Sequence, residues 1–449
     1  MPDDVNPRTT RRRRHNGEAA PQQRLNVAVL VDLVRHPGAG GHVKAWERFA
    51  DAATLFPDQL DLTVYFLGDG ETEERLSDNV RLRTLPPAFG TGRIPWLRNG
   101  GGDTDLASYN PHLAKYLLEH DVFHATSAFA FAKTAETISR RYGRPLVSSV
   151  HTDAAKFAEV YTSEIVEQLL GPNKLSRWLI ETIGVGEISA RNLNRARDRV
   201  LRASDHILVS NRDDSEVIQS AMPYVDVSLL RRGIDQTLFS PKKRDRAWLE
   251  ETYGVPSDVP VVLFAGRVDE SKRVLTVAKA AKRLIDNGQP LHVMIAGTGS
   301  ETGTIKTLLG TNARLAGNVS QEKLARLMAS ADLFVFPSES ETFGNVVIEA
   351  KASGLPVLVT AGATTAPLVS SPGVDGLLAH EGSIDAYADA MASLLIDPAT
   401  RRRIGQAARR QIERSWPDWS DVMAEDLLPI WQKAYESVSK RNIQRRIAA

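Results

Sequence analysis

Residues 338–356 read SESETFGNVVIEAKASGLP, and their pattern is the most informative in the chain. The apolar run before this stretch predicts a buried strand. A helical pattern follows, ends at Gly354, and is succeeded by another apolar strand. The layout is therefore strand, glycine-bearing loop, helix, strand. Because Gly344 and Asn345 fall at the start of the helix, its free amides and positive dipole end favour an anion there.

Two acidic residues flank this predicted helix start. Glu341 lies in the loop, and Glu349 lies about one turn into the helix. A carboxylate can accept two hydroxyls at once, so two carboxylates around an anion-binding helix start suit a sugar-phosphate ligand. The alternative is a pair of surface acids on an amphipathic helix, and these residues alone do not decide between the two interpretations.

Composition limits the classes of function. At 449 residues the chain is long enough for two domains. Its net charge of +1 does not indicate binding to nucleic acid or to a membrane. The lack of cysteine excludes disulfides, thiol catalysis and cysteine-ligated zinc, and it fits a reducing compartment. No apolar run approaches the ~18 residues of a membrane span. The N-terminal segment has no apolar stretch typical of a signal peptide, which predicts a cytoplasmic protein.

Apolar strands alternate with helical stretches from Leu25 onward, a pattern typical of a doubly wound parallel sheet. Two such series predict two α/β domains. The strands of the first series are Leu25–Val31, Leu62–Phe66, Val122–Ala125, Pro145–Val150 and His206–Ser210. Those of the second series are Val259–Ala265, Leu291–Ala296, Ala313–Ala316, Leu333–Pro337 and Val357–Thr360.

The join between the domains is expected within 231–257, where Arg-Arg-Gly, Ser-Pro and a Lys-Lys-Arg cluster break the pattern. The final helix carries several large aromatic side chains, too many for a free tail, so we expect it to pack back across the first domain. The predicted segments are a disordered basic tail (1–23), a first domain (24–235), a second domain (236–414) and the returning helix (415–449).

Ligands of open parallel sheets bind beyond the carboxyl ends of the strands, and several informative loops fall at such ends. The loop GAGGH, with Gly40 and Gly41, follows the first strand but lacks the endings of a P-loop or a dinucleotide fingerprint. Arg267 and Lys272 follow the strand VVLFA, where two cations can clamp a diphosphate without metal. The alternative for this pair is a solvated basic face.

Other candidate sites are weaker. Asp103 and Asp105 have the spacing of a metal-binding Asp-x-Asp motif, but they follow three glycines with no strand signal, which favours a polar turn. His124 either faces the ligand side of the sheet or has a packing role. The sequence leaves open whether His42 reaches the site. The basic stretch 177–202 favours a solvated helix face over an anionic lipid contact.

Taken together, the motifs resemble the donor site of family 4 retaining glycosyltransferases, which have the two-domain GT-B fold. The resemblance runs from about residue 25 to 440. ESETFGNVVIE matches the acidic motif of that family, FAGRVDESKR its Arg/Lys pair, SSVHTDAAKF its first-domain histidine motif, GAGGH its glycine loop, and RRGIDQTLFSP its interdomain segment. Thr342 and Asn345 depart from the usual residues. Neither departure removes a charged group, so both bear on the fit of the donor sugar.

The resemblance implies a role for each matching residue. Glu349 would hold the nucleotide ribose, and Glu341 would contact hydroxyls of the donor sugar. Arg267 and Lys272 would neutralise the departing diphosphate, and His151 would hydrogen-bond the sugar near the reacting carbon. The implied catalytic residues are His151, Arg267, Lys272 and Glu341. The implied donor-binding residues are Gly40, Gly41, Gly266, Gly297, Phe343, Gly344, Asn345 and Glu349.

The expected activity is metal-independent, retaining transfer of a hexosyl group from a UDP- or GDP-sugar to a hydroxyl acceptor, without cofactor or nucleic acid. The acceptor could be a glycolipid, a polysaccharide precursor or a small molecule, and a lipid acceptor would place the protein at the inner face of the membrane. One alternative is a nucleotide-sugar epimerase or hydrolase, which would need further acids or bases in the first domain. Another is a non-catalytic nucleotide-sugar-binding protein, which the intact charged residues disfavour.

Overall fold

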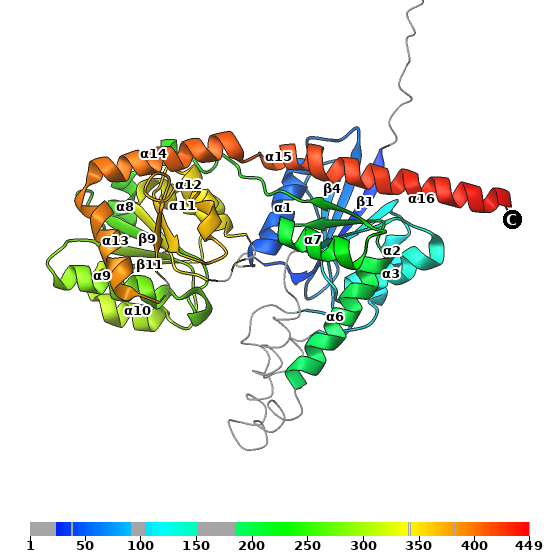
Figure 1. The fold of residues 1–449 in the computed structure, drawn as a ribbon, viewed down its shortest axis with the longest axis horizontal. Helices are drawn as coiled ribbons and strands as arrows, with labels where there is room; N and C mark the ends of the chain where they lie inside the picture. Colours follow the sequence, from blue (N-terminus) through cyan, green and yellow to red (C-terminus); the bar gives the residue numbers. More distant parts are fainter. Residues whose placement is uncertain are drawn as a thin grey trace, which may run out of the picture.

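The computed structural model describes residues 24–36, 39–90, 104–150, 185–339, 341, 343–380 and 382–448. They form two α/β domains that lie side by side, and the last helices run along one edge of both (Figure 1). Each domain surrounds its own sheet. The α/β architecture predicted from the alternating pattern is therefore confirmed.

Within the described residues the first sheet has eight strands in the order β3-β4-β2-β1-β5-β6-β7-β8, parallel except for β3, which runs antiparallel to β4. Its central strands are buried apolar runs, as expected of a parallel sheet covered on both faces. The strands are β1 (Leu25–Val34), β2 (Leu60–Leu67), β3 (Thr72–Arg75), β4 (Val80–Leu85), β5 (Val122–Ala125), β6 (Leu146–Val150), β7 (His206–Val209) and β8 (Asp226–Leu229).

In the second domain, six parallel strands of the described chain form a sheet in the order β11-β10-β9-β12-β13-β14. The order reverses direction at β9, so the loops after β9 and β12 diverge at a switch point where ligands of such sheets bind. The strands are β9 (Val261–Ala265), β10 (His292–Ala296), β11 (Ala313–Gly317), β12 (Leu333–Phe336), β13 (Val357–Thr360) and β14 (Leu377–Ala379).

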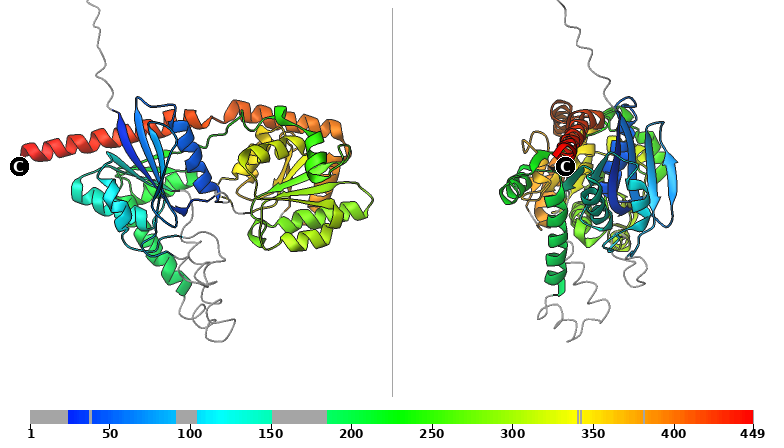
Figure 2. Two further views of the ribbon diagram at one scale, coloured as in Figure 1. Left: turned by 180° about the vertical axis from the view of Figure 1, so that it is seen from behind. Right: turned by 90° about the vertical axis from the view of Figure 1, so that its right-hand side faces the viewer.

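Helices cover both faces of the first sheet, since its two faces carry separate apolar cores, one containing Trp46 of α1 and the other Phe131 of α3. The views in Figure 2 show the same layering for both domains. The helices of the first domain are α1 (Gly41–Ala53), α2 (Pro111–Leu117), α3 (Ala130–Tyr142), α6 (Val185–Ala203) and α7 (Arg212–Ala221). The second domain contains α8 (Arg246–Tyr253), α9 (Val274–Asp286), α10 (Thr302–Leu309), α11 (Gln321–Ser330), α12 (Asn345–Ala352), α13 (Ile384–Ile396) and α14 (Pro398–Ser415).

All ten predicted strands are present, with ends shifted by at most a few residues. Four further strands, β3, β4, β8 and β14, were not predicted. Three of them lie at sheet edges. All side chains of β3 and half of those of β8 are polar, and both strands remain partly or fully exposed. Such strands have no long apolar run, because an edge strand buries little of its surface.

The C-terminal chain packs on the first domain. It continues from α14 through α15 (Trp419–Val422) and a short π-helical turn into α16 (Leu428–Ala448). Trp431 is fully buried and its Nε1 donates to His124 Nδ1 at 3.2 Å, while the Trp419 ring meets Phe49 edge-on at 4.8 Å. His124 therefore has the packing role, and burial lowers its pKa to about 3.

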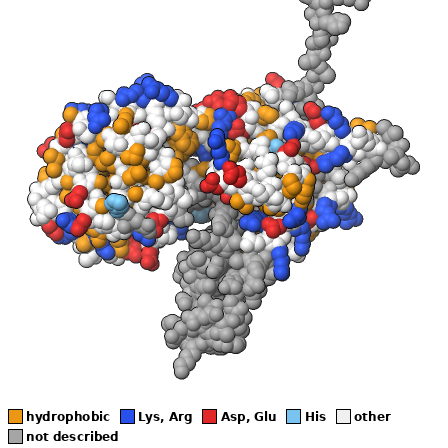
Figure 3. Space-filling model, viewed as in Figure 1, with side chains coloured by type: hydrophobic (Ala, Val, Ile, Leu, Met, Phe, Trp, Pro, Cys, Tyr) orange, Lys and Arg blue, Asp and Glu red, His pale blue; other side chains and the backbone are white. Residues whose placement is uncertain are grey.

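The chain crosses between the domains twice, and the two crossings touch. The backbone amide of Ile234 donates to the carbonyl of Pro417 at 3.0 Å. A side chain at Gly233 would collide with the Trp419 backbone, 2.5 Å from its Cβ position. Arg231 pairs with Asp426 at 2.6 Å and with Glu425 at 2.7 Å. Acidic and basic side chains indeed gather on this face where the domains meet (Figure 3).

Within the part of the chain that the structure describes, none of the helices combines the length and the apolar character needed to cross a bilayer. The basic stretch 177–202 ends in α6, and its first eight residues lie outside the described residues. The lipid contact considered for this stretch remains a prediction, as does the structure of the tail 1–23, which also lies outside the described residues.

Candidate functional site

Helix α12 begins where its sequence predicts, in the loop that follows β12. Gly344 precedes the helix with φ of 65°, and a Cβ at this position would lie 2.6 Å from the Thr365 methyl group. Both the backbone conformation and the close approach therefore require glycine. No side chain among the described residues caps this helix start, so the first amides of α12 can bind an anion.

The start of α1, in the first domain, lies next to the start of α12. A Cβ at Gly41 would come within 3.7 Å of Asn345 Nδ2, and a Cβ at Gly40 would meet no atom within 4 Å. Like α12, helix α1 has no side-chain cap. Two uncapped helix starts, one from each domain, thus meet where the domains face each other (Figure 1). Their partial positive charges add at the same place.

Lys272 and Glu341 are brought together, although 69 residues separate them. Lys272 Nζ lies 2.5 Å from Glu341 Oε1, and each side chain is 17% exposed. Ser338 Oγ donates to the same carboxylate oxygen at 2.7 Å, and the Glu341 amide donates to Thr364 Oγ1 at 2.7 Å. The backbone and the carboxylate of Glu341 are therefore held on both sides.

Arg267 lies in the loop after β9, five residues before Lys272. Its guanidinium contacts Asp269 and Ser271, each at 3.1 Å, and its side chain is 60% exposed. The loop is pressed against the loop after β10, because a Cβ at Gly297 would lie 1.9 Å from the Gly266 carbonyl oxygen. Gly266 and Gly297 both have positive φ, at 148° and 141°. These two glycines, which were predicted to lie near the donor, allow the two backbone segments to approach each other closely.

Glu349 points into the protein from α12. Its Oε2 is buried and has no hydrogen-bond partner among the described residues. Burial raises the pKa of Glu349 to about 7, and Arg48 of α1 acts in the opposite direction. A carboxylate with an unused oxygen can accept hydroxyl groups of a ligand.

One residue with a prominent place at the site was not predicted. Arg232 is 3% exposed, and its guanidinium stacks on the Phe343 ring at 3.9 Å from the ring centre. Burial lowers its pKa to about 9. The segment RRGIDQTLFSP places two arginines at the crossing between domains, but nothing in it indicates which one turns inward. Arg231 faces α15 and the turn after it, and Arg232 faces the site.

The predicted histidines differ in what the structure says of them. His151 lies outside the described residues, so its catalytic role stays a prediction. His42 is in the first turn of α1, and its Nε2 lies 3.0 Å from Thr126 Oγ1. Burial, assisted by the charge of Arg232, lowers the pKa of His42 to about 3, so the ring is neutral at physiological pH.

Within the described residues, no group of three or more His, Asp or Glu side chains is arranged to hold a metal ion. Asp103 lies outside those residues. Asp105 binds the backbone amides of Ala88 and Phe89 at 2.8 and 2.9 Å, and Asn110 Nδ2 at 2.8 Å. Asp105 therefore anchors a loop, in line with the polar turn that the sequence favoured over a metal-binding motif.

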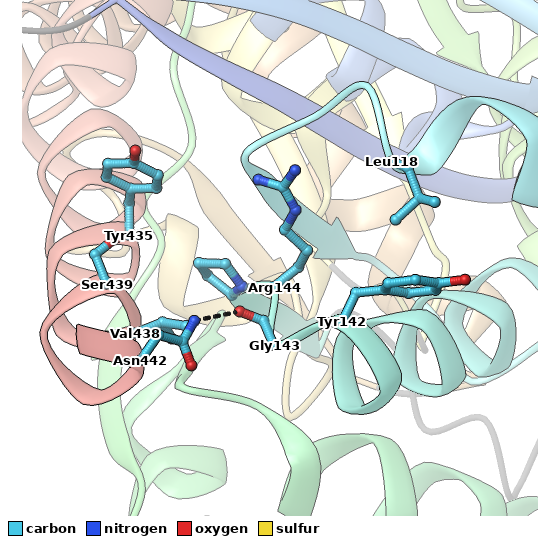
Figure 4. Close-up of a pocket in the computed structure, with 9 residues that line it drawn as sticks. Leu118, Tyr142, Gly143, Arg144, Tyr435, Val438, Ser439 and Asn442 are labelled. Atoms are coloured by element: carbon cyan, nitrogen blue, oxygen red, sulfur yellow. Dashed lines mark hydrogen bonds between the residues drawn. The ribbon is translucent and has the colours of Figure 1, made fainter. Parts of the chain in front are cut away.

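A separate hollow of about 470 Å³ lies at the other end of the first domain, between α16 and the end of α3 (Figure 4). Tyr142, Arg144 and Tyr435 line it, and Asn442 Nδ2 donates to the Gly143 carbonyl at 3.0 Å across its floor. It has none of the residues predicted for the donor site. Gly40, Gly41, Gly344 and Asn345, which were predicted to bind the donor, lie at the starts of α1 and α12 and not in this hollow.

Comparison with known proteins agrees with the motifs. Residues 245–411 match the family model of the glycosyl transferases group 1. A GDP-mannose-dependent alpha-mannosyltransferase of Mycolicibacterium smegmatis is 32% identical over 358 residues, which are 79% of this chain and 83% of that protein. The chain belongs to the group 1 glycosyltransferases. This glycosyltransferase is also similar to a sulfoquinovosyl transferase of Arabidopsis thaliana, 27% identical over 302 residues, which are 67% of this chain and 54% of the relative.

Solved structures share the fold of this glycosyltransferase. A sucrose-phosphate synthase of Thermosynechococcus elongatus has a TM-score of 0.65 at 18% identity, covering 95% of this chain and all of that one. An Anabaena protein in complex with UDP and glucose has a TM-score of 0.61 at 18% identity, covering 93% of this chain and all of that one. The fold is GT-B, as predicted. As a member of the group 1 family with this fold, the protein is a glycosyltransferase.

Proposed function

We propose that this glycosyltransferase moves a hexosyl group with retention of configuration, and that no metal ion takes part in the transfer. The meeting of two uncapped helix starts, with Lys272 bonded to Glu341 in the loop before α12, carries the proposal. Breaking a glycosyl–phosphate bond leaves negative charge on the diphosphate, and fixed positive charge stabilises it as it develops. Two helix dipoles and two cations supply the charge that a metal supplies in other transferases.

Each charged residue has a proposed partner in the donor. Lys272 and Arg267 neutralise the departing diphosphate, and Glu341 accepts hydroxyls of the sugar. Since Lys272 and Glu341 contact each other at 2.5 Å, the donor has to exchange this contact for one with each of them. The sugar hydroxyls and the adjacent phosphate lie a few bonds apart, so one donor can reach both side chains at once.

Retention follows in this proposal from attack on the same face that the diphosphate leaves. The bond between the anomeric carbon and the phosphate oxygen breaks, and the acceptor oxygen bonds to that carbon. The proton of the acceptor hydroxyl passes to the departing phosphate oxygen. We assign His151 to a hydrogen bond with the sugar near this carbon, on the resemblance of its motif alone.

The mannosyltransferase relative makes GDP-mannose the first donor to test, followed by UDP-sugars. The acceptor is a hydroxyl group on a glycolipid, a polysaccharide precursor or a small molecule. A nucleotide-sugar hydrolase or epimerase of the same fold is the alternative. It would release free sugar or an isomerised donor without any acceptor.

Transfer should proceed unchanged in the presence of a chelator, with the anomeric configuration of the donor kept in the product. The test is an NMR assay of donor and acceptor mixtures with and without EDTA, in which the one-bond coupling between the anomeric carbon and its proton reports the configuration. An activity lost to EDTA and restored by manganese would contradict the metal-independent site. An inverted product would contradict same-face attack.

Glu349→Ala should weaken the binding of the nucleoside diphosphate by about 10–100-fold, the effect expected for hydrogen bonds to a charged group. Glu341→Ala should mainly weaken the intact nucleotide sugar, because that carboxylate is assigned to the sugar. Calorimetry with both ligands on both variants measures the ranking. The reverse ranking would exchange or remove the two roles.

The affinity of the wild type for the nucleoside diphosphate should increase as the pH rises through about 7. The pKa of Glu349 is raised to about 7, so its carboxyl is protonated below that pH and ionised above it. The ionised form accepts both ribose hydroxyls, and the protonated form accepts them less well. Glu349→Gln should bind with little dependence on pH over this range, and an unchanged pH dependence would contradict the assignment.

A further inference from the structure

Arg232 is a buried cation that has no counter-charge among the described residues. Its Nε and Nη1 are buried and have no hydrogen-bond partner among the described residues. Burial is the cause of its lowered pKa of about 9, which still leaves the guanidinium charged at physiological pH. A desolvated charge without a partner is costly, and proteins keep such groups where a ligand supplies the counter-charge.

Four acids of the candidate site and of the domain crossing form ion pairs with cations other than Arg232. Arg231, its neighbour in sequence, forms ion pairs with Glu425 and Asp426. Glu341 is bonded to Lys272, and Asp269 to Arg267. Within the described part of the chain, no carboxylate forms an ion pair with Arg232.

The surroundings of Arg232 add positive charge instead of cancelling it. The ring under its guanidinium belongs to Phe343, which directly precedes the start of α12. The charge of Arg232 also acts on His42 in the first turn of α1. Arg232 therefore lies near the starts of both helices, and its charge adds to their partial positive charges. An anion with several acceptor oxygens would balance this charge and accept hydrogen bonds from the buried N–H groups of Arg232.

The aromatic contact supports the guanidinium from one side. The guanidinium carbon lies 3.9 Å from the centre of the Phe343 ring. The N–H groups of a guanidinium lie in its own plane. A planar fork of this kind matches two oxygens of one phosphate group.

We infer that Arg232 is a third cationic ligand of the donor, binding the distal phosphate of the leaving diphosphate from the side of the first domain. This rests on the proposed function, since it assigns a further residue to the same donor. Lys272 and Arg267 approach from the second domain, and Arg232 approaches from the crossing between the domains. The distal phosphate is the group bonded to the sugar, so Arg232 is placed where negative charge develops during transfer.

A difference in stability separates this role from a structural one. Arg232→Met removes an unpaired buried charge, so the melting temperature of the free enzyme should stay the same or rise. The matched control is Arg231→Met, at the next position, which removes one partner of an ion pair with two acids and should lower the melting temperature. A lower melting temperature in both variants would show that Arg232 has a structural partner, and it would overturn the inference.

The binding experiment titrates wild type, Arg232→Met, Arg232→Lys and Arg231→Met with GDP, UDP, GMP and UMP by calorimetry. For the diphosphate that binds wild type, Arg232→Met should lose about tenfold or more in affinity. The monophosphate of the same base, which lacks the distal phosphate, should bind nearly as before. Arg232→Lys keeps the charge without the fork and should retain part of the preference for the diphosphate, and Arg231→Met should retain all of it.

The outcomes distinguish the inference from the function on which it rests. If wild type binds no diphosphate more tightly than the monophosphate, the proposed donor site itself fails. If wild type prefers the diphosphate and Arg232→Met keeps that preference in full, the donor site stands and the role of Arg232 is overturned. An equal loss of diphosphate and monophosphate affinity would also overturn it, since the distal phosphate would then not be the group recognised.

Discussion

Replacing Lys272 or Arg267 by alanine is expected to lower turnover by about 10²–10³-fold, the usual cost of removing one donor that stabilises developing charge. The effect should fall on the rate of transfer more than on the folding of the chain. Lys272 has a side chain that is 17% exposed, and Glu341 keeps its hydrogen bond to Ser338 when Lys272 is removed. Arg267 is 60% exposed and contacts only residues of its own loop among the described residues.

The measurement is the initial rate of nucleoside diphosphate release in the presence of acceptor, with the melting temperature recorded for each variant. Lys282→Ala is a suitable control, because Lys282 is an exposed lysine paired with Asp286 on α9, away from the helix starts. Its rate should equal that of the wild type. If the Lys272 and Arg267 variants both turn over at nearly the wild-type rate, the diphosphate clamp is wrong.

Lys351→Ala is expected to destabilise the second domain by about 3–5 kcal/mol, the typical cost of removing one partner from a buried ion pair. Lys351 lies on α12 and is 1% exposed. Its Nζ contacts Asp375 Oδ2 at 3.0 Å and the Leu368 carbonyl oxygen at 2.5 Å. Removal would leave a buried carboxylate without its cation. The pair also ties α12 to the chain after β13, so it helps to fix the helix that carries Glu349.

Urea denaturation followed by tryptophan fluorescence and circular dichroism measures this cost, with the transition of each domain analysed separately. Lys433→Ala is the control, because Lys433 forms an ion pair of similar length with Asp226, at 2.7 Å, but both side chains are exposed. Removing that pair should cost about 1 kcal/mol or less. Equal, small effects of the two substitutions would show that the buried pair contributes no more than a surface pair.

The sequence predicts the fold well where burial leaves a strong pattern. Strands such as β9 and β12 are continuous apolar runs, and their ends are marked by glycine or proline. The edge strand β3 reads Thr-Glu-Glu-Arg and is fully exposed, so nothing in its composition separates it from a loop. The return of the C-terminal helix could be predicted from its aromatic residues. Its partner His124 could not, because that contact joins residues 307 apart.

In the candidate site, too, local sequence patterns predict some residues and tertiary contacts decide the arrangement of the others. Motif spacing locates Gly344, Glu349 and Arg267, since each is fixed by a local pattern of strand, loop and helix. The pairing of Lys272 with Glu341 depends on how two loops of the sheet meet. The inward direction of Arg232, and the outward direction of Arg231, depend on the chain crossing between domains. No local pattern encodes these arrangements.

A crystal structure of the enzyme with the nucleoside diphosphate that binds most tightly tests the central claim most directly. The account predicts the distal phosphate between the starts of α1 and α12. Its oxygens should lie at about 2.7–3.1 Å from the first amides of α12 and from the side chains of Lys272 and Arg232. A nucleotide bound elsewhere, such as in the hollow between α16 and α3, or a diphosphate turned away from both helix starts, would contradict it.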